Sequence, residues 1–289
     1  MRLVLTLLCR DEADVVEEML AFHLSHGVDM IVATDNRSTD ATRSLLERHQ
    51  RAGRLFLLDE PSLTHDQAPW VTRMARIAVD RFEADWVINA DADEFWWPLR
   101  GNLKEALAGV CPADQVLRIQ RTNFLPPDPA AEVTLPFYES MTLRERQSLN
   151  SLGHPLPAKV CHRGLPLVSV DDGNHGVRLE GQPLPAIPFS EIEILHFPVR
   201  SPSQFERKIR QGAEALERNP RTAGTGIGAT WRQIYQQYWL QDRLGDYYHT
   251  LRPSAEGIRL ALETGALIED RRLRDSLRAV LASPPPDPA

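Results

Sequence analysis

Three carboxylates follow an apolar run near residue 90 of the chain. Trp86, Val87 and Ile88 are typical of a buried strand, and Asp91, Asp93 and Glu94 come shortly after it. On extended backbone, residues two positions apart point to the same side, so the spacing predicts that Asp91 and Asp93 converge at the carboxyl end of this strand. Two convergent carboxylates suit Mg²⁺ or Mn²⁺, which keeps its other positions for water and substrate phosphates.

The alternative is that these acids only cap a helix, with their charges facing the positive end of its dipole. The neighbouring residues favour a site instead. Phe95, Trp96 and Trp97 would enclose the carboxylates, and Pro98 ends the run. A cap that faces solvent has no need of such walls.

The elements that must position these acids alternate in type. We predict four strands, at 2–8, 30–34, 54–58 and 86–89. Three helical patterns separate them: one begins after the acids at 11–14, and the others occupy 41–50 and 67–82. This alternation predicts an α/β fold with a doubly wound, mostly parallel sheet and right-handed crossovers. The turn at 35–40 follows a strand, so we expect it at the same sheet edge; Ser38 or Thr39 would cap the next helix and leave Asp35 free for a ligand.

Composition narrows the class of protein. The 289 residues carry a net charge of −7 with a sequence pI near 5.7, which argues against a dedicated nucleic-acid binder. Cys9, Cys111 and Cys161 are scattered, so they predict neither disulfides nor a metal site and indicate a reducing compartment. The apolar run at 3–9 is too short to span a membrane. We therefore expect a cytoplasmic protein, with attachment to the inner face of the membrane left open.

The second half of the chain has less regular patterning. A strand is predicted at 115–121, a rigid loop at 123–129, and a region rich in Gly, Pro and His at 155–181 that we interpret as acceptor-contacting loops. A strand at 191–195 delivers His196. Helices follow from Ser203, the second of which carries an aromatic stripe that we assign to the core, and residues 283–289 are predicted to be a disordered, Pro-rich tail.

An ordered set of motifs resembles one enzyme family. The set comprises Thr6-Leu7-Leu8-Cys9-Arg10-Asp11-Glu12, Gly27-Val28-Asp29, Asp35-Asn36-Arg37-Ser38-Thr39-Asp40 and Asp91-Ala92-Asp93-Glu94-Phe95. It is similar to the family 2-like and family 92-like glycosyltransferases, whose metal motif also reads Asp-x-Asp-Glu-Phe. The resemblance covers about the first hundred residues. Asp11 departs from it, because the family usually has Asn there.

The resemblance implies a GT-A fold over 1–200, a helical region over 201–282, Mn²⁺ or Mg²⁺, and transfer from a UDP- or GDP-linked sugar to a hydroxyl of a glycan or lipid-linked acceptor, with inversion as in family 2. It implies that Asp35 accepts a hydrogen bond from the base, that Asp91 contacts ribose or metal, and that Asp93 is the main metal ligand. The other donor-binding residues implied by it are Leu8, Arg10, Glu12, Arg73 and Ala92. Arg73 is equally well interpreted as a solvated helix residue.

Two further roles come from late in the chain. His196 follows a predicted strand, as the aspartates do, and resembles the late histidine that completes the metal shell in several GT-A enzymes, with Arg200 or Lys208 holding the diphosphate. The alternative is a structural histidine. An inverting transfer needs a carboxylate to deprotonate the acceptor, and Asp171 or Asp172, with Glu139 behind them, are the candidates. Taken singly, either aspartate is better explained by a turn.

Two other classes of protein are weighed against this one. A nucleotidyltransferase would usually carry a Gly-rich phosphate loop after the first strand, and residues 8–11 contain no glycine. A non-catalytic binding protein with a degenerate transferase fold is the other, and the intact Asp91, Asp93 and His196 argue against it.

Overall fold

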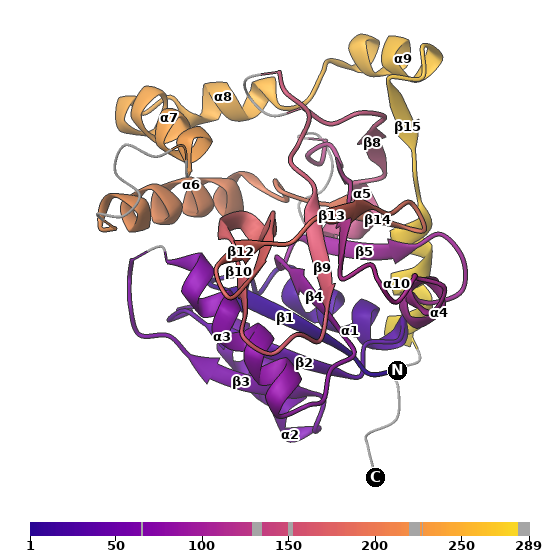
Figure 1. Ribbon diagram of the computed structural model, residues 1–289. Coiled ribbons are helices and arrows are strands. Elements are labelled where there is room, and N and C mark those ends of the chain that lie inside the picture. Colours follow the sequence, from indigo (N-terminus) through magenta and orange to yellow (C-terminus); the bar gives the residue numbers. More distant parts are fainter. Residues whose placement is uncertain (65, 129–134, 150–152, 220–225, 227, 283–289) are drawn as a thin grey trace.

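The computed structural model describes residues 1–64, 66–128, 135–149, 153–219, 226 and 228–282. The tail predicted at 283–289 and part of the loop predicted at 123–129 lie outside these residues. The described chain is a mixed α/β structure in which a seven-stranded sheet is flanked by helices (Figure 1). No helix within the described ranges is long and apolar enough to cross a membrane.

The main sheet has the strand order β13-β6-β9-β4-β1-β2-β3. Strands β4, β1, β2 and β3 are mutually parallel, and β9 is antiparallel to both of its neighbours. The predicted α/β fold class with a largely parallel sheet is confirmed. Its strands are β1 (Leu3–Cys9), β2 (Met30–Asp35), β3 (Leu55–Asp59), β4 (Trp86–Ala90), β6 (Val116–Ile119), β9 (Lys159–Arg163) and β13 (Ala186–Pro188).

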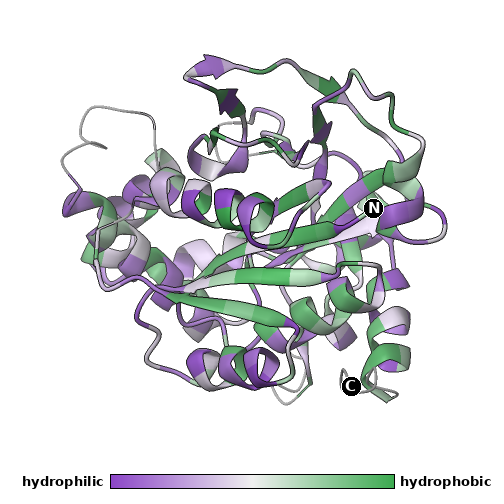
Figure 2. Ribbon diagram, turned by 60° about the horizontal axis from the view of Figure 1, so that its bottom comes forward, coloured by the Kyte–Doolittle hydropathy of each residue, from purple (hydrophilic) through white to green (hydrophobic). Residues whose placement is uncertain are grey.

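Alternating side chains of the central strands fill two separate cores. Leu3, Leu5 and Leu7 of β1 belong to one apolar cluster, whereas Val4 belongs to another on the opposite face of the sheet. Helix α1 (Val16–Ser25) and helix α2 (Thr42–Arg51) cover the first face, and helix α3 (Gln67–Asp80) covers the second. Burial on both faces explains why these strands are apolar throughout, as Figure 2 shows.

A second, three-stranded sheet lies beside the first and carries part of the site. It has the order β5-β14-β7, with β14 antiparallel to β5 and parallel to β7. Its strands are β5 (Glu94–Pro98), β7 (Arg121–Asn123) and β14 (Ile192–His196). Smaller strands make up a third and a fourth sheet: β8 (Leu143–Glu145), β10 (Val168–Val170), β11 (Val177–Leu179), β12 (Gln182–Pro183) and β15 (Leu267–Glu269).

Most of the C-terminal region is helical, as predicted. Helices α6, α7 and α8 gather on one side of the molecule around their own apolar cluster (Figure 1), whereas α10 returns to pack on α1. The predicted aromatic stripe contributes Ile234 and Tyr235 to this cluster. The remaining helices are α4 (Leu103–Ala108), α5 (Phe137–Ser140), η1 (Asp172–Asn174), α6 (Pro202–Glu217), α7 (Ala229–Gln237), η3 (Trp239–Gln241), α8 (Leu244–Thr250), α9 (Ala255–Glu263) and α10 (Arg272–Ala282).

Two local expectations were wrong. Residues 91–93 form a turn between β4 and β5, in which the amide of Glu94 donates to the carbonyl of Asp91, so the backbone there is not extended. The region at 155–181 is not all loop, because it contains β9, a central strand of the main sheet. Its buried residues include Lys159 and His162, and these polar side chains hide the strand pattern.

Candidate active site

The carboxyl ends of β1, β2 and β4 lie at one edge of the main sheet, and the end of β14 meets them there. The strand order places β4 on one side of β1 and β2 on the other, so the chain reverses its winding direction at this point. In open α/β sheets, ligands bind outside the strand ends at such a reversal. The acids that follow these strands therefore lie at one edge of the sheet.

Asp93 lies at the centre of a group of basic side chains. Its Oδ2 accepts a hydrogen bond from Lys208 Nζ of α6 at 2.5 Å and lies 3.8 Å from Arg200 Nη1. Its Oδ1 lies 3.6 Å from His196 Nε2. Burial raises the pKa of Asp93, but the positive charges around it, of which that of Lys208 is the largest, outweigh burial and hold that pKa well below its usual range. Asp93 is therefore a carboxylate at neutral pH.

His196 is oriented by Asn123, the last residue of β7. The Nδ1 of His196 lies 2.7 Å from the amide oxygen of Asn123, and because an amide oxygen can only accept, Nδ1 carries the proton. Burial lowers the pKa of His196, which keeps the ring neutral. Its Nε2 therefore presents a lone pair toward the carboxylate of Asp93.

This arrangement passes a simple test of fit for a divalent cation. Two acceptors, Nε2 of His196 and Oδ1 of Asp93, face each other across 3.6 Å. That separation is less than twice a metal–ligand distance of about 2.0–2.1 Å, so one ion can contact both. A histidine that binds metal through one ring nitrogen commonly donates the N–H of its other ring nitrogen to a carbonyl oxygen, as His196 does to Asn123. Among the described residues, no group of three or more His, Cys, Asp or Glu side chains is arranged to hold a metal ion.

Arg200 is fixed by acids of the loop after β1. It lies almost fully buried, donates to Glu12, and places Nε 2.7 Å from Asp14 Oδ2. Burial raises the pKa of Glu12 despite the charge of Arg200. These contacts place Arg200 beside Asp93. Because Glu12 and Asp14 already balance the charge of Arg200, Lys208 is the cation more available to a bound anion.

Asp91 has a different set of partners from Asp93. Its Oδ2 accepts from Lys159 Nζ of β9 at 2.5 Å, and Asn174 and Gln67 donate to its Oδ1 at 3.3 and 3.4 Å. Lys159 is also 3.2 Å from Glu94, which is fully buried. Burial raises the pKa of Asp91, but the charge and hydrogen bond of Lys159, together with the charge of Arg121, outweigh burial and lower the pKa overall. Asp91 and Asp93 thus belong to two neighbouring clusters.

Asp11 links three elements at the ends of β1 and β2. Its Oδ1 accepts from the amides of Thr39 and Asp40, and its Oδ2 accepts from Gln211 of α6 at 2.7 Å. Its φ of +54° lies in the left-handed region, where Asp and Asn are the favoured residues after Gly. This explains why Asp can stand where the resembling family has Asn.

The other predicted donor-binding residues lie at or near this edge. Asp35 is buried and its Oδ1 accepts from the amide of Ser38 at 3.1 Å, so part of its bonding capacity serves the turn. Arg10 lies 3.9 Å from Asp11, and its buried Nε has no hydrogen-bond partner within the described chain. Leu8 is half-buried at the end of β1, and Ala92 is buried in the turn beside Asp93. Arg73 lies on α3 and reaches the carbonyl of Asp59.

Asp171, Asp172 and Glu139, the candidate catalytic bases, make no hydrogen-bonded or ionic contact with Asp93 within the described residues. Asp171 pairs with Arg178 at 2.8 Å, and Asp172 accepts from the amide of Ala68. Asp171 precedes η1 and Asp172 begins it, and Asn174 of the same element donates to Asp91, so both aspartates lie on the Asp91 side. Glu139 pairs with Arg278 of α10. Their catalytic role stays a prediction.

Sequence reasoning missed Asn123, Lys159 and Asn174 as site residues. Asn123 ends β7, which runs parallel to β14. The rule that site residues follow strand ends, which located His196, would have located Asn123 as well if the predicted strand at 115–121 had been divided into β6 and β7. Lys159 and Asn174 carry no comparable signal, because they reach Asp91 only through β9 and the segment after it.

Comparisons with known proteins give only distant likenesses. No family model matches the chain, and no curated protein sequence matches it significantly. Among solved structures, S. aureus TarS 1-349 in complex with UDP-GlcNAc is 15% identical over 76% of this chain and 68% of that one, with a TM-score of 0.42. A longer TarS structure aligns over 98% of this chain but only 55% of its own length, with a TM-score of 0.39.

A second solved protein is also similar to this chain. Glucosyl-3-phosphoglycerate synthase from Mycobacterium tuberculosis, in complex with Mn²⁺, UDP and glucosyl-3-phosphoglycerate, is 13% identical over 88% of this chain and 81% of that one, with a TM-score of 0.36. These likenesses are too distant to assign an activity, so the proposal below stands on the geometry of the site.

Proposed function

We propose that this protein is a metal-dependent glycosyltransferase of the GT-A type, which moves a sugar from a UDP- or GDP-linked donor to a hydroxyl acceptor. One observation carries the proposal. Asp93 and neutral His196 face each other at the carboxyl edge of the main sheet, with the ammonium of Lys208 2.5 Å from the same carboxylate. A pair of metal ligands beside a lysine ammonium suits a diphosphate.

Asp93 and His196 would hold the ion, and Asn123 would keep the imidazole in the required tautomer. When bound, Mn²⁺ or Mg²⁺ neutralises charge on the departing diphosphate. Lys208 contributes a second positive charge beside Asp93 and can turn from this carboxylate to a phosphate oxygen. Arg200, held by Glu12 and Asp14, positions the loop after β1 against β14.

The Asp91 cluster would bind the sugar hydroxyls of the nucleoside. The Oδ1 of Asn174 is buried and has no hydrogen-bond partner within the described residues, although the residue's Nδ2 donates to Asp91. A buried oxygen without a donor is costly, and a ribose hydroxyl would satisfy it. Asp35 and Arg10 lie along the same edge toward β2, where the base would extend.

For an inverting transfer, a carboxylate must take the proton of the acceptor hydroxyl. Asp171 and Asp172 remain our candidates, because both adjoin Asn174 at the Asp91 cluster. A cytoplasmic protein that meets lipid-linked acceptors at the membrane face fits the same proposal.

The proposal predicts slow hydrolysis of one nucleotide sugar. The protein is incubated with a panel of UDP- and GDP-linked sugars and Mn²⁺, and release of the nucleoside diphosphate is followed. We expect release from at least one donor, no release in chelator, and at least a hundredfold slower release with Asp93→Asn. A panel that yields no hydrolysis and no metal-dependent nucleotide binding would overturn the proposal in favour of a non-catalytic binding protein.

A further inference from the structure

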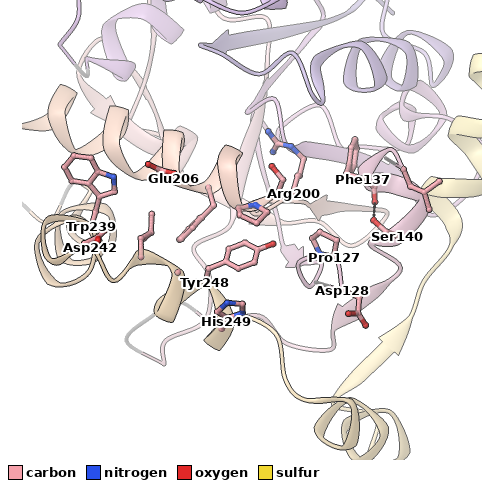
Figure 3. Close-up of a pocket in the computed structure, with 16 residues that line it drawn as sticks. Pro127, Asp128, Phe137, Ser140, Arg200, Glu206, Trp239, Asp242, Tyr248 and His249 are labelled. Carbon is pink, nitrogen blue, oxygen red and sulfur yellow. Dashed lines mark hydrogen bonds between the residues drawn. The ribbon is translucent and has the colours of Figure 1, made fainter. Parts of the chain in front are cut away.

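A cavity of about 500 Å³ lies next to the candidate site, on the side of the C-terminal helices (Figure 3). It is enclosed by α5, by Pro127, Asp128 and Leu135, by the first turns of α6, and by η3 and α8. Its volume falls in the range of small-molecule sites, about 300–1,000 Å³. Of the residues considered above for donor or metal binding, Arg200 alone is among those that line this cavity.

Two lining residues connect the cavity to the Asp93–His196 pair. Arg200 contributes to its wall and places Nη1 3.8 Å from Asp93 Oδ2. Phe137 of α5 lines the cavity and packs edge-on against Phe197, the residue after His196, with ring centroids 5.1 Å apart. A molecule bound here would therefore lie beside the reacting groups of the proposed donor site.

The lining combines aromatic side chains with carboxylates. Trp239, Tyr248 and Phe205 present aromatic surface from η3, α8 and α6, and Glu206 and Asp242 contribute acids. No hydrogen bond or ion pair engages the carboxylate of Glu206 or that of Asp242 within the described part of the chain. The cavity thus offers both apolar faces and free acceptors.

This chemistry selects one kind of ligand. The C–H face of a sugar ring packs on aromatic surface, while its hydroxyls donate to carboxylates. A hydrocarbon chain would offer no hydrogen-bond donor to Glu206 or Asp242. A phosphorylated ligand would meet like charges, because the guanidinium of Arg200 is already balanced by Glu12 and Asp14.

We propose that this cavity is a binding site for an uncharged sugar unit, and that this sugar is the acceptor. The identification as acceptor rests on the proposed function, whereas binding of the sugar does not. The stretch from Trp231 to Trp239 then has two roles, since Tyr235 stacks on Trp239 at 4.9 Å and holds the ring that faces the cavity.

Sugar binding can be measured without donor or metal. The full-length protein is tested against an immobilised panel of neutral and phosphorylated mono- and oligosaccharides, with alkyl glycosides as a separate arm, and the dissociation constants of retained sugars are measured by calorimetry. We expect at least one neutral sugar to bind, with Trp239→Ala weakening it at least tenfold and Glu206→Gln weakening it several-fold. The matched controls are Leu240→Ala in the same turn and Glu217→Gln on the same helix, neither of which lines the cavity.

Several results would overturn the sugar site: no neutral sugar retained, a preference for phosphorylated sugars, binding only when an alkyl chain is attached, or affinities that neither cavity variant changes. Glu206 is exposed, so its variant keeps the test decisive if Trp239→Ala fails to fold. UDP and GDP binding with Mn²⁺ is measured on the same preparation. Sugar binding without nucleotide binding would refute the transferase and leave the sugar site intact, and the reverse result would refute only the sugar site.

Discussion

Asp91 and Asp93 are two residues apart in the sequence but have separate surroundings in the structure. Asp93 meets a histidine of β14 and a lysine of α6, whereas Asp91 meets a lysine of β9 and an asparagine of η1. One cluster pairs a carboxylate with a neutral ring nitrogen, and the other pairs it with a buried ammonium. On this difference we propose metal binding for Asp93 and a polar binding or positioning role for Asp91.

The largest expected effect concerns the stability of the Asp91 cluster. Lys159 is almost fully buried and contacts both Asp91 and Glu94, so Lys159→Met leaves buried carboxylates with less compensation. We expect the free energy of unfolding to fall by roughly 3–5 kcal/mol, measured by urea denaturation. Lys208→Met should cost clearly less, because the side chain of Lys208 is 23% exposed and Asp93 keeps the guanidinium of Arg200 at 3.8 Å. Equal losses in the two variants would contradict this distinction.

The next effect concerns metal affinity in the Asp93 cluster. His196→Ala removes a proposed ligand and should weaken Mn²⁺ binding about 100-fold, while Asn123→Ala removes only its orienting partner and should weaken binding about tenfold. Electron paramagnetic resonance of free Mn²⁺ measures both. Asn174→Ala is the matched control in the Asp91 cluster and should leave Mn²⁺ affinity unchanged. If Asn174→Ala weakens Mn²⁺ binding as much as Asn123→Ala does, the two clusters act as one metal site.

The smallest effect tests competition for one carboxylate oxygen. Lys208 Nζ holds Asp93 Oδ2, so Lys208→Met should raise the affinity of the nucleotide-free protein for Mn²⁺ a few-fold. The same variant should bind UDP or GDP more weakly in the presence of Mn²⁺. The affinities of Lys208→Arg should fall between those of Lys208→Met and those of the unaltered protein. Unchanged metal affinity together with unchanged nucleotide affinity would remove Lys208 from the site.

The sequence predicts the sheet well because its central strands are buried on both faces. The apolar runs that became β1, β2, β3 and β4 were located to within one residue at either end, and the alternation of strands and helices predicted their parallel order. The same rule placed His196 at the end of β14. Strand β9 escaped detection, since Lys159 and His162 are polar side chains that are buried by ion pairing and hydrogen bonding.

The site itself is less predictable, because its contacts join residues far apart in the chain. The spacing of Asp91 and Asp93 suggested convergence, but the turn between β4 and β5 aims them at different partners. Lys208 lies 115 positions beyond Asp93, and only the packing of α6 on the loop after β1 brings it there. Such pairings depend on how helices dock, which a local pattern does not record.

The most direct test of the account compares the two aspartates in a single measurement. Calorimetry gives the affinity of UDP and GDP with Mn²⁺ and with chelator for the unaltered protein, Asp93→Asn and Asp91→Asn. We expect Mn²⁺ to tighten binding at least tenfold in the unaltered protein, Asp93→Asn to abolish that gain, and Asp91→Asn to weaken binding while keeping the gain. An Asp93→Asn variant that retains the full Mn²⁺ gain, or an unaltered protein that binds equally well in chelator, would contradict the assignment of Asp93 to the metal.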